Sequence, residues 1–286
     1  MKNTLLHLRI PFSFFLLPIY LFALSQSPAI NTTKSWWVFF ILHFLLFPAS
    51  NAYNSYYDKD EGSIGLLENP PPVSKALLYT AWAMDILAVI LGLFFVNPIF
   101  AGYLLVYGLV SKAYSHPVIR LKKYPIISWL LVTIFQGFVT YIFVYQAITL
   151  DCQIFELIDF QILLPAFICT SNLLAIYPIT QVYQHEEDAQ RGDLTMSRVL
   201  GIRGTFLNAV SWLGFSGIGF LIYFGFTKSF LLLMILLFPL LSFFGWWMWQ
   251  VWKDEQQANF KNTMWLNLLA GICLNLLFGI LYFLNH

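Results

Sequence analysis

The chain has few charges and few cysteines, and both shortages exclude whole classes of protein. Only 10% of its 286 residues are charged, whereas 59% are hydrophobic and 19% aromatic, and the mean hydropathy is +0.71. Long, nearly uncharged apolar stretches of this kind are typical of membrane spans and not of a soluble domain. The three cysteines have neither zinc nor redox spacing and cannot form an even set of disulfides. We interpret them as small hydrophobic residues in or near the spans.

Basic runs with interleaved aromatic residues are also missing, and the net charge is only +1. Nothing in the sequence therefore indicates a nucleic-acid partner. We expect no cleavable signal peptide, because the first apolar segment leads directly into the pattern of the later spans. The expected partners are membrane lipids and ligands that dissolve in them.

Apolar runs of about 20 residues predict an all-α, polytopic membrane protein with nine transmembrane helices. The connections between the runs are short, so we expect one bundle and a single transmembrane domain over residues 1–286. The predicted spans are 9–26, 35–57, 75–96, 97–115, 125–149, 160–184, 203–226, 229–252 and 263–284.

The basic residues predict how these spans are oriented. With nine spans, 13 of the 15 lysines and arginines fall on one side, and only Lys34 and Lys228 fall on the other. Lysine and arginine are enriched in cytoplasmic loops. We therefore predict an integral protein of the cytoplasmic (inner) membrane, with its N-terminus in the cytoplasm and its C-terminus outside.

Two short segments at the ends of apolar spans hold half of the carboxylates. Residues 54–62 read NSYYDKDEG and residues 184–193 read QHEEDAQRGD, and together they contain seven of the 14 acids. If helical, each segment presents one stripe of carboxylate and amide groups. The first stripe is Asn54, Asp58 and Glu61; the second is Gln181, Gln184 and Asp188, with Glu187 at its edge.

Two such stripes could hold Mg²⁺ by one or two carboxylates each, with waters and substrate phosphates completing the coordination shell. The alternative is that both are merely solvated helix ends. A third segment, 112–123, favours the first interpretation because its cations could bind phosphate oxygens and stabilise a departing diphosphate. These cations are Arg120, Lys122 and Lys123. Alternatively, they anchor the loop at lipid headgroups.

The order of these motifs resembles that of a known family. The first acidic segment is similar to the Asn-x-x-x-Asp motif that ends the second helix in that family. Residues 68–74 are similar to the proline-rich stretch that follows this motif. Residues 114–122 resemble a loop between the fourth and fifth helices, and Gly192 and Gly201 have the spacing seen after a second aspartate-rich motif. By these features, nearly the whole chain resembles the UbiA-type superfamily of intramembrane prenyltransferases.

This resemblance implies a helical bundle around a central cavity that lipid-soluble substrates enter laterally. In that cavity, Mg²⁺ and basic residues would bind the diphosphate of a polyprenyl donor. Ionisation would give an allylic cation, which an acceptor attacks, often an aromatic one such as a quinone precursor. The implied activity is that of a transferase for alkyl or aryl groups other than methyl.

The matching positions, together with nearby oxygens that could replace missing acids and the other cation of the loop, give an expected site. The metal ligands would be Asn54, Asp58, Asp60, Gln184, Glu187 and Asp188. The substrate-binding residues would be Asn54, Tyr114, Arg120, Lys122 and Lys123. The catalytic residues would be Asp58, Asp188 and Arg120.

Two positions depart from the family pattern, because Gly62 and Gln184 stand where it usually has aspartate. An alternative is therefore a relative with altered catalysis that binds a prenyl lipid. Cyclisation of the prenyl chain instead of transfer also stays open. A membrane transporter is the third alternative, but it predicts internal repeats and charges near the membrane midplane. The sequence shows no clear repeat, and Asp85 is the only charge near the midplane.

Overall fold

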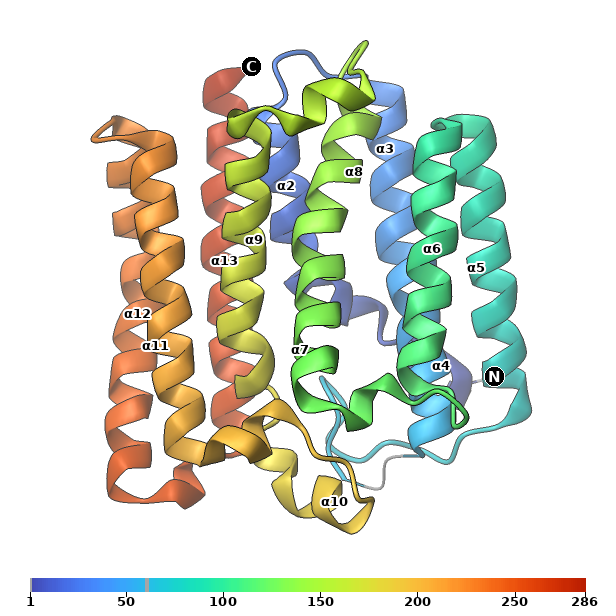
Figure 1. Ribbon diagram of the computed structural model, residues 1–286, viewed down its shortest axis with the longest axis vertical. Helices are drawn as coiled ribbons and strands as arrows, with labels where there is room; N and C mark the ends of the chain where they lie inside the picture. Colours follow the sequence, from blue (N-terminus) through green and yellow to red (C-terminus); the bar gives the residue numbers. More distant parts are fainter. Residues whose placement is uncertain (1, 60–61) are drawn as a thin grey trace.

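The computed structural model describes residues 2–59 and 62–286, which form long helices that lie side by side (Figure 1). These residues contain no strand, which confirms the all-α prediction. The helical elements in chain order are α1 (Lys2–Leu8), η1 (Ile10–Phe15), α2 (Leu17–Gln26), α3 (Thr32–Phe40), η2 (Ile41–Leu46), α4 (Phe47–Asp58), α5 (Lys75–Phe95), α6 (Pro98–Ser115), η3 (Leu121–Lys123), α7 (Pro125–Thr133), η4 (Ile134–Val139), α8 (Thr140–Ile148), η5 (Ile154–Ile158), α9 (Phe160–Ile179), η6 (Val182–Gln184), α10 (His185–Gln190), α11 (Met196–Phe224), α12 (Lys228–Lys253), η7 (Glu255–Gln257) and α13 (Phe260–Asn285).

The predicted count of nine membrane spans is not confirmed. Within the described residues, seven helices are long and apolar enough to cross a membrane, or eight if one bent pair counts as a single span. The bent pair is the first predicted span, which turns by 41° between Asn3–Phe15 and Leu17–Gln26. The predicted span 97–115 forms α6, which is not among the seven because its glycines, tyrosines and Lys112 lower its hydropathy.

Prolines explain two irregular segments. The first span is broken because Pro11 and Pro18 each lie near the start of a new helical element. A proline ring collides with the carbonyl one turn earlier and cannot donate to it. In the second span, Pro48 follows the π-helical turn η2, where the Phe47 N–H donates to the Leu42 carbonyl, five residues back. The helix nevertheless continues from Thr32 to Asp58.

The core of the bundle is rich in aromatic rings. Phe22 of α2 stacks on Phe278 of α13 with 4.2 Å between ring centroids, and it also contacts Tyr141 and Phe220. Because lipid tails are as apolar as these rings, packing stabilises such contacts more than removal from water does. Close packing also requires Gly137, since a Cβ there would lie 2.7 Å from the Thr170 Cα atom.

The helix that leads to the second acidic segment ends early. Pro178 is the penultimate residue of α9, and the chain continues through the 3₁₀ turn η6 into the short helix α10. The prediction that Gln181, Gln184 and Asp188 form a single α-helical stripe is therefore wrong. Figure 1 shows α10, the turn between α6 and α7, and the end of α4 at the same end of the bundle.

Candidate active site

A cavity of about 260 Å³ lies at this end of the bundle. Seven of the expected site residues line it, namely Asn54, Asp58, Tyr114, Lys122, Gln184, Glu187 and Asp188. Apolar side chains complete the wall, among them Phe12, Leu131, Val132, Phe135 and Met264. Residues 120–123, which we call the basic turn, contribute Lys122 to this wall. The two acidic segments and the basic turn are far apart in the sequence and thus meet at one cavity.

The first acidic segment presents its groups on the last turns of α4. Asp58 is the final residue of this helix, which ends because Lys59 adopts a left-handed conformation with φ of 51°. The Lys122 ammonium donates to Asp58 Oδ1 over 2.5 Å. One turn earlier, the Asn54 side-chain oxygen accepts a hydrogen bond from the Ser115 hydroxyl. Asn54 therefore contacts the last residue of α6, and Asp58 contacts the turn that follows this helix.

The two lysines of the basic turn differ in burial. The turn begins at Arg120, whose left-handed backbone (φ of 44°) reverses the chain before the 3₁₀ turn η3. Lys122 is buried and lines the cavity. Lys123 is exposed, and its ammonium lies 5.2 Å from the centre of the Tyr124 ring. The structure brings Lys122 to the site and does not bring Lys123 there.

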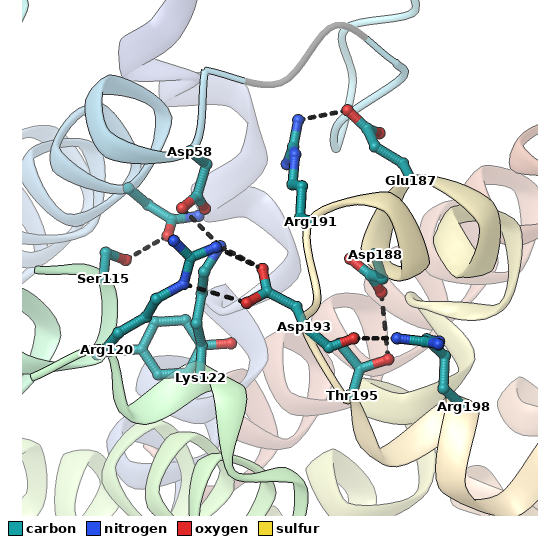
Figure 2. Close-up of polar contacts among 12 residues, drawn as sticks. Asp58, Ser115, Arg120, Lys122, Glu187, Asp188, Arg191, Asp193, Thr195 and Arg198 are labelled. Carbon is teal, nitrogen blue, oxygen red and sulfur yellow. Dashed lines mark hydrogen bonds and ion pairs between the residues drawn. The ribbon is translucent and has the colours of Figure 1, made fainter. Parts of the chain in front are cut away.

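Asp193, the last residue of the second acidic segment, contacts the basic turn, and we predicted no role for it from the sequence. Arg120 Nε donates to Asp193 Oδ1 over 3.1 Å, and Arg120 Nη2 donates to Oδ2 over 2.9 Å. Lys122 Nζ lies 3.3 Å from the same Oδ2. Figure 2 shows Arg120 and Lys122 converging on this carboxylate, with Asp58 on the other side of Lys122. Arg120 is not among the cavity-lining residues and reaches the site through Asp193.

The charges of Arg120 and Asp193 stabilise each other. Burial alone would raise the pKa of the Asp193 carboxyl, but the hydrogen bond from Arg120 and the nearby Lys122 charge outweigh it and hold that pKa below its usual value. The same hydrogen bond raises the pKa of Arg120. Both groups therefore stay ionised at neutral pH, although Asp193 is only 3% exposed.

Glu187 of α10 connects the two acidic segments. Its Oε1 accepts a hydrogen bond from the Gly62 N–H over 3.2 Å and one from Arg191 Nη2 over 2.5 Å. A Cβ at Gly62 would lie 2.6 Å from Glu187 Oε2, so a larger residue at position 62 would displace this carboxylate. The departure at Gly62 thus makes room for an acid from the other segment.

Gln184 and Asp188 lie beside Glu187 and are held by fewer groups. The Gln184 side-chain amide donates to the Ser63 carbonyl over 3.1 Å. Asp188 Oδ2 accepts a hydrogen bond from the Thr195 hydroxyl over 3.2 Å, as Figure 2 shows. Asp188 makes no ion pair with a residue that the structure describes. It is thus a half-buried carboxylate that lines the cavity without an ion-pair partner among the described residues.

A pair of phenols forms part of the wall between the segments. Tyr114 of α6 and Tyr177 of α9 line the cavity with their hydroxyl oxygens 2.5 Å apart. Tyr177 was not predicted, and only its position one turn before the break in α9 could have indicated it. In a hydroxyl pair, one group donates to the other and the second proton is free for another acceptor.

Asp85, the acid near the membrane midplane, is not part of the cavity wall. It forms an ion pair with Lys112 between α5 and α6, and the Lys112 ammonium lies 4.4 Å from the Trp82 ring centre. Asp85 therefore joins two helices through a buried ion pair and does not line the cavity.

The described residues contain no group of three or more His, Cys, Asp or Glu side chains close enough to hold a metal ion. Lys122 lies between Asp58 and Asp193, so in this structure these two carboxylates do not face one shared metal position. Asp60 and Glu61, two of the acids of the first segment, lie outside the described residues. The donor set nevertheless fits Mg²⁺, which binds one or two carboxylates and takes its other ligands from water and phosphate. Carboxylate and amide oxygens from both segments line the same cavity.

Comparison with known proteins identifies the family. The sequence model of the UbiA prenyltransferase family matches residues 15–269. The chain belongs to this family. The match confirms the resemblance seen in the motifs. No curated protein matches the chain in sequence.

Several solved structures have the same fold. A UbiA homologue from Archaeoglobus fulgidus bound to DMAPP and Mg²⁺ is 16% identical with a TM-score of 0.71, over 99% of this chain and 98% of that chain. A UbiA homologue from Archaeoglobus fulgidus bound to GPP and Mg²⁺ is 16% identical with a TM-score of 0.68, over 98% of this chain and 99% of that chain. A digeranylgeranylglyceryl phosphate synthase structure is 17% identical with a TM-score of 0.61, over 99% of this chain and 97% of that chain. At these identities the likeness shows the fold.

Proposed function

We propose that this UbiA family member transfers a prenyl or polyprenyl group from an allylic diphosphate to a lipophilic acceptor, with Mg²⁺ as cofactor. One observation carries the proposal: oxygen ligands from two acidic segments and the buried Lys122 line a single cavity within a bundle of apolar helices. The relatives bound to DMAPP or GPP together with Mg²⁺ support it. The acceptor we propose is aromatic, such as a quinone precursor.

Asp58 and Asp188 would hold the metal, helped by nearby oxygens. Asn54, Gln184 and Glu187 contribute these oxygens from the cavity wall, and Asp60 is a further proposed ligand. When bound, Mg²⁺ neutralises charge on the diphosphate and so makes it a better leaving group. Asp58 would bind the metal through a carboxylate oxygen, and its contact with the Lys122 ammonium could persist through the other. Lys122 has three N–H donors, so one could also reach a phosphate oxygen.

Lys122, Arg120 and Tyr114 would bind the diphosphate itself. Charge that develops on the leaving group is stabilised best by donors that are already in place. Lys122 is fixed by two carboxylates, and Tyr114 can aim a hydroxyl proton into the cavity if it accepts the Tyr177 proton. The allylic cation would form beside the apolar wall of Leu131, Val132 and Phe135, which excludes water, and ring faces attract cations.

We further propose that the chain is one transmembrane domain in the cytoplasmic membrane, with its N-terminus inside and its C-terminus outside. In that orientation the charged end of the cavity faces the cytoplasm, where a soluble diphosphate product can leave. The excess of lysine and arginine at this end supports the orientation.

Membranes that contain the protein, supplied with radiolabelled farnesyl diphosphate, test the activity. We expect pyrophosphate release and a labelled lipid product with Mg²⁺, and neither when EDTA removes the metal. Activity that survives both EDTA and Asp58→Asn would falsify the metal-site assignment. Binding of the labelled donor without release would favour the alternative of a relative that binds a prenyl lipid without turnover.

A further inference from the structure

We propose that Asp193 is an internal competitor for the diphosphate. Its carboxylate takes the N–H donors of Arg120 and Lys122 that a phosphate group would otherwise take. It thereby weakens the hold of the site on pyrophosphate and helps the product to leave. This inference deepens the proposed function and depends on it for its biological meaning, but its test needs no prenyl transfer.

The geometry of the Arg120–Asp193 pair is that of phosphate recognition. Two guanidinium N–H groups point at the two carboxylate oxygens over 3.1 and 2.9 Å. Arginine presents the same fork to carboxylate and to phosphate, so one anion excludes the other from it. Lys122 adds a third donor to Asp193 Oδ2 over 3.3 Å. Asp193 therefore engages both cations to which the proposed function assigns the diphosphate.

Asp193 is held more firmly than its partner. Its backbone N–H donates to the Asp188 carbonyl over 2.9 Å, and its carbonyl accepts from Arg198, as Figure 2 shows. Its side chain is 4% exposed, whereas that of Arg120 is 30% exposed. When a diphosphate arrives, we expect the Arg120 side chain to swing from Asp193 to the phosphate while Asp193 stays in place.

Charge balance gives the direction of the effect. Arg120 and Lys122 carry two positive charges, and Asp58 and Asp193 carry two negative charges next to them. Replacing Asp193 by asparagine keeps the shape but leaves this group with one net positive charge. The N–H donors of Arg120 and Lys122 can then bind the incoming anion without first breaking ionic contacts with Asp193. Hydrogen bonds to charged groups are strong enough that we expect about tenfold tighter pyrophosphate binding.

The test measures binding of inorganic pyrophosphate to purified protein in lipid nanodiscs by isothermal titration calorimetry, with Mg²⁺ present. The dissociation constant of Asp193→Asn should fall about tenfold relative to the unmodified protein. Asp151→Asn is the matched control, because Asp151 is an exposed acid in the loop between α8 and η5, at the opposite end of the bundle. Asparagine also suits its left-handed backbone (φ of 55°), and binding should be unchanged.

A dissociation constant that rises or stays the same in Asp193→Asn overturns the proposal, since a residue that only positions Arg120 would weaken binding when removed. If Asp193→Asn does not fold, Asp193→Glu replaces it. The longer side chain keeps the negative charge but disturbs the paired hydrogen bonds with the Arg120 guanidinium. Pyrophosphate binding should therefore tighten, by up to threefold. Weaker or unchanged binding again overturns the proposal. Failure to release pyrophosphate from farnesyl diphosphate would contradict the proposed function alone.

Discussion

Asp58 and Asp188 hold the same place in the two acidic segments, four residues after Asn54 and Gln184, yet one lies at the end of a continuous helix and the other lies beyond a helix break. Asp58 is fixed by α4 and contacts the Lys122 ammonium. Asp188 lies on the short helix α10, where the Thr195 hydroxyl is its hydrogen-bond donor. The two similar motifs therefore supply different groups. The first contributes a carboxylate already balanced by a cation, and the second contributes one that has no ion pair with a described residue.

The largest effect is expected from Asp58→Asn, because this change removes a proposed metal ligand and also a partner of Lys122. We expect the rate of prenyl transfer to fall by about 1,000-fold, as when a key electrostatic group is lost from an active site. Release of labelled pyrophosphate from farnesyl diphosphate measures this rate. A loss of less than tenfold would show that Asp58 does not hold the metal.

Lys122→Met tests whether the first segment needs a cation for stability. The change leaves Asp58 and Asp193 buried close to each other, and breaking a buried pair costs about 3–5 kcal/mol. We expect lower stability to denaturant in detergent micelles, and partial recovery in millimolar Mg²⁺, because the metal can replace the lost charge.

Asp85→Asn is the comparison for that experiment. It also breaks a buried pair, with Lys112, but at a place away from the cavity. Stability should fall, and Mg²⁺ should not restore it. Equal recovery of both variants would mean that the metal stabilises the bundle in general and not through the first segment.

Thr195→Val addresses the second segment and should have a smaller effect. Asp188 loses the hydrogen bond from the hydroxyl, whose net contribution is about 1 kcal/mol. We expect the Mg²⁺ concentration for half-maximal activity to rise by about fivefold, because the carboxylate is less well positioned, with a loss of stability of about 1 kcal/mol or less. If this concentration is the same in both proteins, Asp188 does not take part in metal binding.

The smallest effect concerns pH. The pKa of Asp193 is lowered in the folded protein, so its contribution to stability is fully present above the unfolded value of about 3.9 and is lost as the pH falls through the folded value. The difference in melting temperature between the unmodified protein and Asp193→Asn should therefore be constant from pH 7 to about pH 5 and shrink below about pH 4. A difference that disappears between pH 7 and pH 5 would contradict the ion pair.

The sequence predicted the helices and seven of the polar residues that line the cavity, because apolar runs and polar clusters are local signals. Asp58, Lys122 and Asp188 could be placed at one end of the bundle from span order and charge alone. Asp193 could not be assigned a role, since its partners Arg120 and Lys122 lie more than 70 residues earlier and only the fold brings them together. The break after α9 was missed because an apolar run looks continuous even where Pro178 ends the helix.

A structure of the protein with Mg²⁺ and a non-hydrolysable analogue of geranyl diphosphate tests the central claim most directly. The account predicts metal density between the diphosphate and the carboxylates of Asp58 and Asp188, with Lys122 on a phosphate oxygen. A diphosphate bound outside this cavity, or metal held without either carboxylate, would contradict it.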